Sequence, residues 1–563
     1  MTAEFSPGLT LILGSALLPL LPVRLRGAYT VALPLLGMLQ LAMLHTGETG
    51  QLDFLGMELV LLRVDRWSML FGWIFMIAAA LSAVFALHVR SALQQAAALA
   101  YAGSAIGAVF AGDMITLFVY WELTAVTSVA LVWARGTQAS YRAGMRYFLM
   151  QLLSGMLLFF GAIAFYQQTG SVRFDHVGLH GLAGWLIFLA FGIKCAFPLL
   201  HNWLQDSYPE ATETGTVFLS AFTTKLAVYA LARGFAGTEI LIPIGAVMTA
   251  FPIFFAVIEN DLRRVLAYSL NNQLGFMVLG IGIGTELSLN GTAAHAFTHI
   301  LYKALLFMSM GAVLYRTGTV KGSELGGLYK SMPYTTAFCI IGAASISGFP
   351  LFSGFVSKSM ILSAAGAGGY IVAWSVLLFA SAGVFHHSGI KIPYFAFFGH
   401  DSGKRCEEAP RHMLVAMGIA AALCVGIGVY PAPLYAILPF PVVYEPYSGS
   451  HVLAQLQLLG FSALAFAVLM RTGIYPPEMR SVNLDTDWVW RRALPAVGEA
   501  GANFVGAAQG LLGRRAARIG STLLAWVVRH HGADGWLAQP WQTRGMSLWV
   551  LVLLLGYLVL YYI

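Results

Sequence analysis

Lysine, histidine and glutamate residues lie inside apolar segments of this sequence that are long enough to form membrane-spanning helices. Glu122 is the only carboxylate of its segment, FVYWELTAVTSVAL, and Lys194 and Lys225 lie in two further apolar segments. A charged side chain in the middle of a bilayer costs about 2.5–3.5 kcal/mol on insertion scales, so its presence requires a reason. The passage of ions is the simplest reason. A snorkelling role for Glu122 is the alternative, but the residue lies about nine positions into its helix, where reach is poor.

Two proline-containing breaks accompany these lysines. The motif FPL at 197–199 follows Lys194, and a second FPL at 349–351 precedes Lys358. An interrupted helix at membrane depth is tolerated only where protein or a water-filled cavity satisfies the freed backbone groups. Because inverted repeats with discontinuous helices are a recurrent transporter design, the two motifs indicate an internal repeat.

A third group of residues recurs at every fourth position. His295, His299 and Lys303 in AAHAFTHILYKALLF project from one face of one helix. Two histidines with this spacing can also bind zinc, but no carboxylate or cysteine stands nearby in the sequence as a third ligand. Histidine titrates near neutrality, which suits the transfer of protons. We therefore interpret the row as a proton relay.

Four further charged residues have two interpretations each. Lys391, in HHSGIKIPYFAFF, fits a central position in the membrane as well as a position near the cytoplasmic face. The carboxylates that flank the first break are either ion-access residues or part of a solvated loop: Asp206, Glu210 and Glu213.

A Glu122–Lys194 pair provides a physical means of moving protons. Two opposite charges about 4 Å apart gain roughly 4 kcal/mol at an effective dielectric constant near 20. Pairing favours the charged lysine, and separating the pair inside an apolar site favours release of its proton. We hypothesise that such a switch drives a proton from Lys225 towards His299 and Lys358.

The composition indicates an all-α polytopic membrane protein. Of 563 residues, 58% are apolar and only 10% are charged, which excludes a soluble enzyme. The net charge of +7 does not require a nucleic acid, because basic residues collect in loops on one side of a membrane. The four scattered cysteines have no CxxC spacing, and GIGIG (280–284) lacks the strand–turn–helix context of a nucleotide site. We expect no cofactor and no metal.

Apolar runs of span length predict about sixteen transmembrane helices. They lie near residues 7–23, 27–45, 67–88, 92–111, 114–134, 144–167, 181–200, 214–233, 238–258, 264–284, 288–314, 334–364, 370–398, 412–430, 451–470 and 546–562. Residues 51–65 alternate enough to form a short extended segment at the surface. The first run has no basic residue before it and is interpreted as a span rather than a signal peptide.

Lysine and arginine concentrate in the odd-numbered loops. The positive-inside rule therefore predicts a multi-pass protein of the bacterial inner membrane with both termini on the periplasmic side. Pro495–His531 shows apolar residues at helical spacing among arginines, which indicates an amphipathic helix of roughly 55 Å on the cytoplasmic interface. Two shorter helices broken at Gly513 or Gly520 are the alternative.

Several motifs taken together resemble one transporter family. They are WEL on the fifth span, HNWL-x-D after the first break, TTKLAVYAL, DLRRVLAYSLNNQLGF, HAFTHILYKALLF and SGFPLFSGFVSK. Over about residues 60–400 they resemble the antiporter-like subunits of respiratory complex I and of Mrp-type Na⁺/H⁺ antiporters, and the D-type Mrp subunits in particular. The family usually has a proline where this chain has Gln205 and a lysine where it has Arg263.

The resemblance implies a fourteen-helix core with two inverted five-helix repeats and a hydrophilic axis along the middle of the membrane. It assigns the carboxylate–lysine pair to Glu122 and Lys194, the connecting lysine to Lys225, the histidines to His295 and His299, and the terminal lysine to Lys358. We expect N-terminal spans (1–88), two repeats (89–235 and 236–400), C-terminal core spans (401–470), a cytoplasmic amphipathic segment (471–545) and a final helix (546–563).

Three functions are compatible with such a relay. The first is proton translocation coupled to Na⁺ or another monovalent cation, in a complex with other membrane subunits. The second is a proton-pumping module of a complex I-like or hydrogenase-type redox complex. The third is a proton-conducting partner of an inorganic-carbon uptake system. In each case the chain has no catalytic chemistry of its own, and its partners are the lipid bilayer, ions and other subunits.

Overall fold

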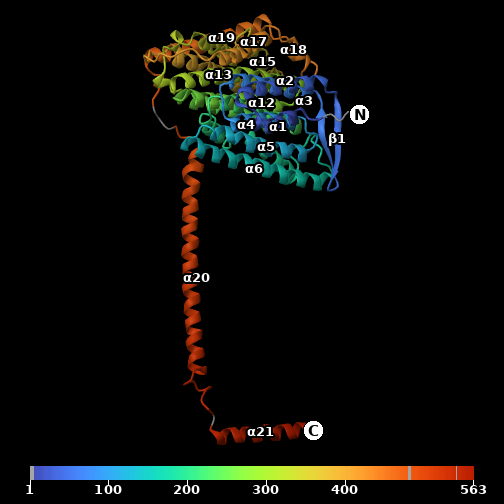
Figure 1. Cartoon of the computed structure of the whole chain (residues 1–563), viewed down its shortest axis with the longest axis vertical. Helices are drawn as coiled ribbons and strands as arrows, with labels where there is room; N and C mark the ends of the chain where they lie inside the picture. The colour runs from blue at the N-terminus through green and yellow to red at the C-terminus, as the bar shows by residue number, and fades with distance from the viewer. Residues whose placement is uncertain (1–4, 480–482, 541) are drawn as a thin grey trace. The chain divides into compact units, whose positions relative to one another are not determined.

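The computed structural model describes residues 5–479, 483–540 and 542–563. The chain divides into two units, Met1–Asn483 and Leu484–Ile563. Within the described residues, eleven helices are long and apolar enough to cross a membrane. The first unit is a bundle of helices that pack side by side, with a single β-hairpin (Figure 1). The all-α membrane fold predicted from composition is confirmed.

Every predicted span coincides with one or more helices. The helices of the first unit are α1 (Pro7–Leu17), α2 (Val23–Met43), α3 (Arg66–Phe85), α4 (Ala92–Val109), α5 (Met114–Trp133), α6 (Gln138–Thr169), α7 (Gly181–Lys194), α8 (Asn202–Ser207), α9 (Gly215–Ala221), α10 (Thr223–Gly234), α11 (Leu241–Ile258), α12 (Leu262–Ile283), α13 (Glu286–Thr317), α14 (Pro333–Ser347), α15 (Ser353–Ala367), α16 (Ile371–Val384), α17 (Arg411–Val429), α18 (Ala432–Ala436) and α19 (Gly449–Thr472). The short helices α8 and α18 lie between predicted spans. Two π-helical segments, Phe385–Lys391 and Tyr394–Phe398, extend α16.

Both FPL motifs lie at helix breaks, as predicted. The first lies after α7, and the second lies between α14 and α15. In each motif the leucine adopts a left-handed backbone conformation, with φ of 70° at Leu199 and 73° at Leu351. Such a conformation is uncommon for a residue other than glycine. Its occurrence in both motifs shows that the two breaks are built alike.

Two matching loops occur at corresponding positions of the two predicted repeats. Asp113 caps α5 and forms an isolated β-bridge with Arg173, and Asp261 caps α12 and forms the same bridge with Lys321. The partners follow α6 and α13, which both have 32 residues. Asp113 and Asp261 are 148 positions apart, as are Arg173 and Lys321. The two bridges belong to opposite ends of the bundle, described next.

The loops of the first unit gather at two ends of the helices. Ion pairs join Arg63 to Asp175, Arg173 to Glu48 and Arg233 to Asp65, and we call this end the hairpin side. At the other end, which we call the basic-loop side, ion pairs include those of Arg135 with Glu210 and of His88 with Glu213. The grouping of loops predicted from their basic residues is thus confirmed. The prediction that the basic-loop side is cytoplasmic concerns the membrane itself and stays a prediction.

The predicted extended segment is a β-hairpin that begins earlier than expected. Strand β1 (Gly47–Phe54) pairs antiparallel with β2 (Met57–Val64). The prediction of a surface position is wrong for β2, because Val60, Leu62 and Val64 are buried. Backbone hydrogen bonds join this strand to Phe110 and Gly112, so that the hairpin closes the ends of α4 and α5.

The second unit contains α20 (Leu494–His531) and α21 (Thr543–Tyr562). Helix α20 is continuous over 38 residues and passes through Gly513 and Gly520 without a break. The prediction of one long helix is therefore confirmed, and the alternative of two short helices is wrong. Residues 480–482 and 541 of the predicted amphipathic segment lie outside the described residues.

Candidate functional site

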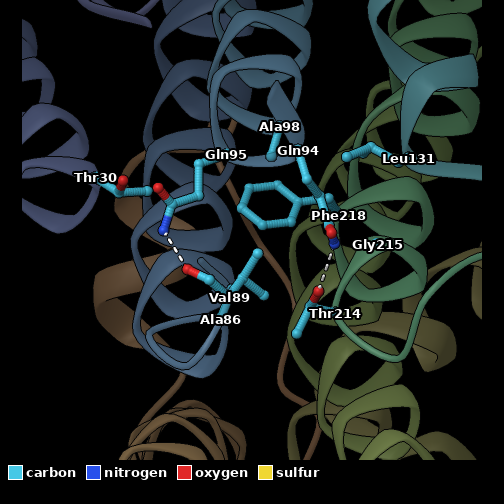
Figure 2. A pocket seen from close by; sticks show the side chains of 10 residues that line it. All are labelled: Thr30, Ala86, Val89, Gln94, Gln95, Ala98, Leu131, Thr214, Gly215 and Phe218. Atoms are coloured by element: carbon cyan, nitrogen blue, oxygen red, sulfur yellow. Dashed lines mark hydrogen bonds between the residues drawn. The ribbon is translucent and has the colours of Figure 1, made fainter. Parts of the chain in front are cut away.

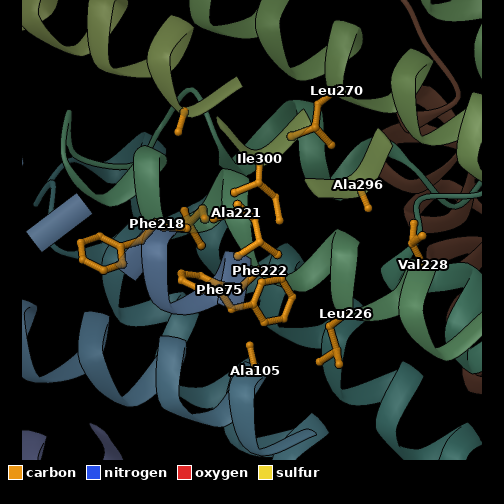
Figure 3. Close-up of a cluster of buried hydrophobic side chains, with 14 of the residues drawn as sticks. Phe75, Ala105, Phe218, Ala221, Phe222, Leu226, Val228, Leu270, Ala296 and Ile300 are labelled. Atoms are coloured by element: carbon orange, nitrogen blue, oxygen red, sulfur yellow. The ribbon is translucent and has the colours of Figure 1, made fainter. Parts of the chain in front are cut away.

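Lys225 lies one turn after the bend that separates α9 from α10. Its ammonium Nζ donates a hydrogen bond of 2.6 Å to the carbonyl oxygen of Ser220, which the bend leaves without a helical partner. Figure 3 shows the apolar side chains around this bend, among them Phe222 and, from neighbouring helices, Phe75 and Ile300. Lys225 is thus fully buried, and the broken helix supplies the oxygen that stabilises its charge.

Lys194 is the last residue of α7 and reaches across to α5. Its Nζ donates to the carbonyl oxygen of Trp121 at 2.6 Å and to Oγ1 of Thr124 at 2.8 Å. The ammonium also lies 4.5 Å from the centre of the Trp121 ring, a cation–π distance. The lysine is fully buried, and one side of α5 therefore holds its charge.

Glu122 follows Trp121 directly on α5 but does not touch Lys194. In the part of the chain that the structure describes, Oε1 of Glu122 is buried without a hydrogen-bond partner. The carboxylate packs against Gly155 of α6, where an added Cβ would overlap Oε1. The charges of Glu122 and Lys194 lie close enough to interact. The structure therefore shows the two residues as neighbours, with the lysine bonded elsewhere.

His295 is held by a hydrogen-bond network. Its Nε2 lies 3.1 Å from Oε1 of Gln273, which also accepts from the Tyr302 hydroxyl at 3.2 Å. Because an amide oxygen only accepts, the hydrogen of the neutral ring lies on Nε2. Nδ1 then accepts from the Ser357 hydroxyl at 3.2 Å. Both ring nitrogens of His295 are therefore committed to fixed partners.

His299 and Lys303 lie next along the same face of α13 and differ from His295. Both ring nitrogens of His299 and the Nζ of Lys303 are buried, and they have no hydrogen-bond partner among the described residues. The charge of Lys225 acts on both residues. Buried polar groups are normally hydrogen-bonded, and ordered water is the usual partner where protein supplies none. These two side chains are therefore placed to bind water or an exchanging proton.

Lys358 and Lys391 continue the line beyond α13. Nζ of Lys358 donates to the carbonyl oxygen of Ile346 at 3.0 Å, at the end of α14. Lys391 is fully buried near the basic-loop side, where Nζ donates to the carbonyl oxygen of Glu259 at 2.6 Å. His387 connects the two regions, since the charges of Lys358 and Lys391 both act on it. Of the two interpretations of Lys391, the structure thus supports the one near the basic-loop side.

The three predicted ion-access carboxylates all lie on the basic-loop side, and each is paired with a basic group. Asp206 contacts Arg146, Glu210 lies 3.3 Å from Arg135, and Glu213 lies 3.4 Å from His88. The hydrogen bond from His88 holds the pKa of the Glu213 carboxyl below its usual value, although burial acts in the opposite direction.

A small, mainly apolar pocket lies at Thr214, the residue after Glu213. Figure 2 shows it between Thr30, Gln95 and the start of α9, where Gln94 donates to Oγ1 of Thr214 at 3.1 Å. Helix α9 leads from this pocket to the bend that carries Lys225. Of the three carboxylates, Glu213 is therefore the best placed to receive an ion from the basic-loop side.

Seven of the eight predicted relay residues fall into two groups, and Lys391 lies apart from them near the basic-loop side. One group consists of basic side chains close enough for their charges to repel one another, on α10, α13 and α15: Lys225, His295, His299, Lys303 and Lys358. Glu122 and Lys194 form the second group, next to Cys195, whose thiol lies within reach of the charge of Lys225. Among the described residues, no direct contact joins Lys194 to Lys225.

Sequence reasoning missed several residues of the site. Gln273 and Tyr302 fix His295, and both lie in polar-containing motifs, SLNNQLGF and HILYKALLF, that could have indicated them. Glu478 lies 2.9 Å from Nζ of Lys391, and its position after α19 gives no local signal.

Arg263 departs from the pattern of the resembled family, and the sequence did not predict its role. Its guanidinium donates to the carbonyl oxygens of Tyr208, Pro209, Ala211 and Thr212 and holds the loop between α8 and α9.

Comparisons with known proteins agree with this fold. Residues 111–383 match the family described as "NADH:quinone oxidoreductase/Mrp antiporter, TM". This match covers just under half of the chain, and it shows that these residues are similar to that family. The matched region begins just before α5 and ends in α16, and it includes Glu122, the row on α13 and Lys358.

One curated relative of this family is the D-type subunit of the Na⁺/H⁺ antiporter of Alkalihalophilus pseudofirmus. It is 31% identical over 323 residues, which are 54% of this chain and 64% of that protein. The chain thus spans less than two thirds of the length of this relative.

Two solved structures share the fold. A chain of the Mrp complex from Dietzia sp. DQ12-45-1b superimposes with a TM-score of 0.67 at 21% identity, over 85% of this chain and 100% of that chain. A chain of the archaeal membrane-bound sulfane sulfur reductase gives a TM-score of 0.72 at 22% identity, over 98% of this chain and 99% of that chain. The antiporter-like fold is therefore established, and both similar chains are parts of membrane complexes.

Proposed function

We propose that this chain is the proton-translocating subunit of a multisubunit monovalent cation/H⁺ antiporter, with Na⁺ as the first candidate cation. The observation that carries the proposal is the set of buried basic side chains from Lys225 to Lys358. A buried charge is retained in a membrane protein where it serves an ion pathway. The identity with the D-type subunit of a Na⁺/H⁺ antiporter supports the choice of coupled process.

Protons enter this pathway from the basic-loop side. In this proposal the pathway runs from the pocket at Thr214 along α9 to Lys225, and from there His299 and Lys303 offer unpaired donors and acceptors. His299 passes the proton towards Lys358, while His295 keeps its fixed hydrogen bonds. Water molecules at the unpaired groups complete the path, because a water needs two to four polar partners.

The Glu122–Lys194 pair acts as the switch. In the structure Lys194 donates to the carbonyl oxygen of Trp121 rather than to Glu122, and we take this arrangement as one of the two states of the switch. Movement of the ammonium from the carbonyl oxygen to the carboxylate would change the charge that Lys225 experiences. The switch can drive the relay only if the two positions of the Lys194 ammonium differ in how strongly they favour a proton on Lys225.

Replacement of Glu122 tests the switch. Glu122→Gln should reduce proton transport to background in vesicles that contain the chain with its native partner subunits, while assembly of the complex is unchanged. Glu286→Gln, at an exposed position in the first turn of α13, is the matched control and should transport normally. Normal transport by Glu122→Gln would remove the switch from the mechanism.

A redox-driven complex is the second candidate. The similar chain of the sulfane sulfur reductase covers 98% of this chain, so the fold similarity includes the residues of the second unit. In that case the relay would be the same, and the energy source would lie in other subunits. Purification of the complex decides between the two: an antiporter would couple ΔpH to uptake of radiolabelled Na⁺, whereas a redox complex would contain an electron-transfer subunit.

A further inference from the structure

Four oxygen atoms surround the ammonium group of Lys391. The carbonyl oxygens of Ala256, Val257 and Glu259 lie 3.2, 2.7 and 2.6 Å from Nζ, and Oε1 of Glu478 lies 2.9 Å from it. The lysine side chain is fully buried, and the side chain of Glu478 is only 5% exposed. We call these four oxygens the α11 oxygen cage.

The cage follows from the way in which α11 ends. The helix stops at Ile258, and Glu259 is extended, so that the last carbonyl groups have no helical partner. The C-terminal end of a helix also carries a partial negative charge. Such ends of helices, together with unwound carbonyl groups, coordinate Na⁺ in transporters with broken helices. The end of α11 therefore offers the ligands of an alkali cation.

The carboxylate of Glu478 has capacity for a further ligand. Its second oxygen, Oε2, is buried without a hydrogen-bond partner among the described residues. The same carboxylate packs against Gly322, where an added Cβ would lie 3.3 Å from Oε2. The segment after α19 and the loop after α13 thus converge on the cage at the basic-loop side.

Other charged groups face the cage without entering it. The charge of Glu259 acts on Lys391, but its carboxylate accepts hydrogen bonds from the backbone of Asn260 and Asp261. His386 and His387 lie on the same helix as Lys391, and the charge of the lysine acts on both. The ammonium is therefore the group that fills the cage.

A π-helical segment presents the lysine to the cage. Residues Phe385–Lys391 form π turns, and Lys391 is the last of them. Such turns are rare and are frequently found at functional sites. His387, in the same segment, bonds through Ser388 to Ser269 of α12, which links the cage to the interior of the bundle.

We propose that the α11 oxygen cage is a monovalent-cation site in which the ammonium of Lys391 occupies the place of the cation. This inference rests on the proposed antiport function and names its cation site. When Lys391 loses its proton to the relay, the neutral amine leaves the cage and an alkali cation takes its place. Return of the proton restores the ammonium and releases the cation. One proton is thus exchanged for one cation at the same oxygens.

Equilibrium binding of radiolabelled Na⁺, and separately Rb⁺, to the purified complex tests this proposal. Wild-type affinity should rise with pH, by up to about tenfold per pH unit for the exchange of one proton. Lys391→Gln should bind the cation at all pH values, and Lys391→Arg should bind it at none. Glu478→Gln, which removes the carboxylate charge, should weaken binding by about tenfold or more.

The exposed ion pair of Lys330 with Asp401, 3.2 Å apart, provides the control. Lys330→Gln should leave cation binding unchanged. If Lys391→Gln assembles but binds no cation, and wild-type binding is independent of pH, the lysine only caps α11 and the proposal is overturned. Loss of proton transport in Glu122→Gln together with that result would leave the proposed function intact and remove only the cation site.

Discussion

The carboxylate of Glu122 lies in the notch that Gly155 leaves on the surface of α6. A methyl group at position 155 would overlap Oε1 of Glu122. The glycine therefore determines where the carboxylate of the switch lies relative to Lys194. Neighbouring helices are commonly brought close by small residues in membranes, and here the space holds an acidic side chain.

Gly155→Ala should impair transport without removing any charged group. The added methyl group forces the flexible Glu122 side chain away from α6, which changes its distance from Lys194. We expect a fall in proton flux comparable with that of Glu122→Gln, measured by quenching of a pH-sensitive dye in vesicles. Gly460→Ala in α19, where a Cβ meets open space, is the control. Full transport by Gly155→Ala would show that the position of the carboxylate is not critical.

The two histidines of α13 should differ in importance. His299 has two unpaired nitrogens, whereas Gln273 and Ser357 occupy both nitrogens of His295. Positioned proton-transfer groups contribute about 100-fold or more to a rate, so His299→Gln should lower proton flux by about that factor. His295→Gln should lower it by about tenfold or less. The reverse order would show that protons pass through the hydrogen-bonded histidine instead.

Arg263 should be needed for the stability of the first break. Its guanidinium is fully buried and donates to four carbonyl groups of the loop between α8 and α9. A lysine has three donors on a single atom and cannot reproduce this planar arrangement. Because hydrogen bonds to charged groups contribute about 1.5–3 kcal/mol each, Arg263→Lys should lower the melting temperature of the complex measurably. Arg514→Lys, on exposed α20, should not.

The hairpin side should lose stability in acid. The Asp65 carboxylate contacts Arg233, and although burial raises the pKa of Asp65, the arginines at 233 and 63 and the cap on α3 lower it below its usual value. Its contribution to stability is therefore present above about pH 4 and is lost as the pH falls through the depressed pKa.

Asp65→Asn isolates this contribution, because asparagine caps a helix as well as aspartate does. The variant should be less stable by about 2 kcal/mol at neutral pH, since it leaves Arg233 without its charged partner. Below about pH 4 the melting temperatures of the two proteins should converge. If the melting temperatures of the two proteins instead changed with pH in parallel, the acid-sensitive part of the stability would come from another group.

The fold and much of the site could be predicted because their signals are local. Apolar runs defined the spans, the FPL motifs defined the breaks, and the four-residue spacing placed His295, His299 and Lys303 on one face. The arrangement of side chains across helices could not be predicted. That Lys194 bonds to the backbone of Trp121, or that Glu478 reaches Lys391, depends on contacts between segments that are distant in the sequence.

The continuity of α20 is another feature that the sequence alone did not determine. Two glycines, at 513 and 520, each weaken a helix by roughly 1 kcal/mol relative to alanine, and this left a broken helix open as an alternative. The helix is nevertheless continuous, although four further glycines lie in it, at 498, 501, 506 and 510, so helix propensity alone did not predict where it ends.

Proton flux through vesicles that contain Lys225→Gln tests the central claim most directly. The chain, assembled with its native partner subunits, is exposed to an imposed pH difference, and the internal pH is followed with time. We predict that the variant assembles but conducts protons only at the background rate, whereas Lys404→Gln, at an exposed loop position, conducts as the wild type does. Proton flux at the wild-type rate in Lys225→Gln would contradict the relay.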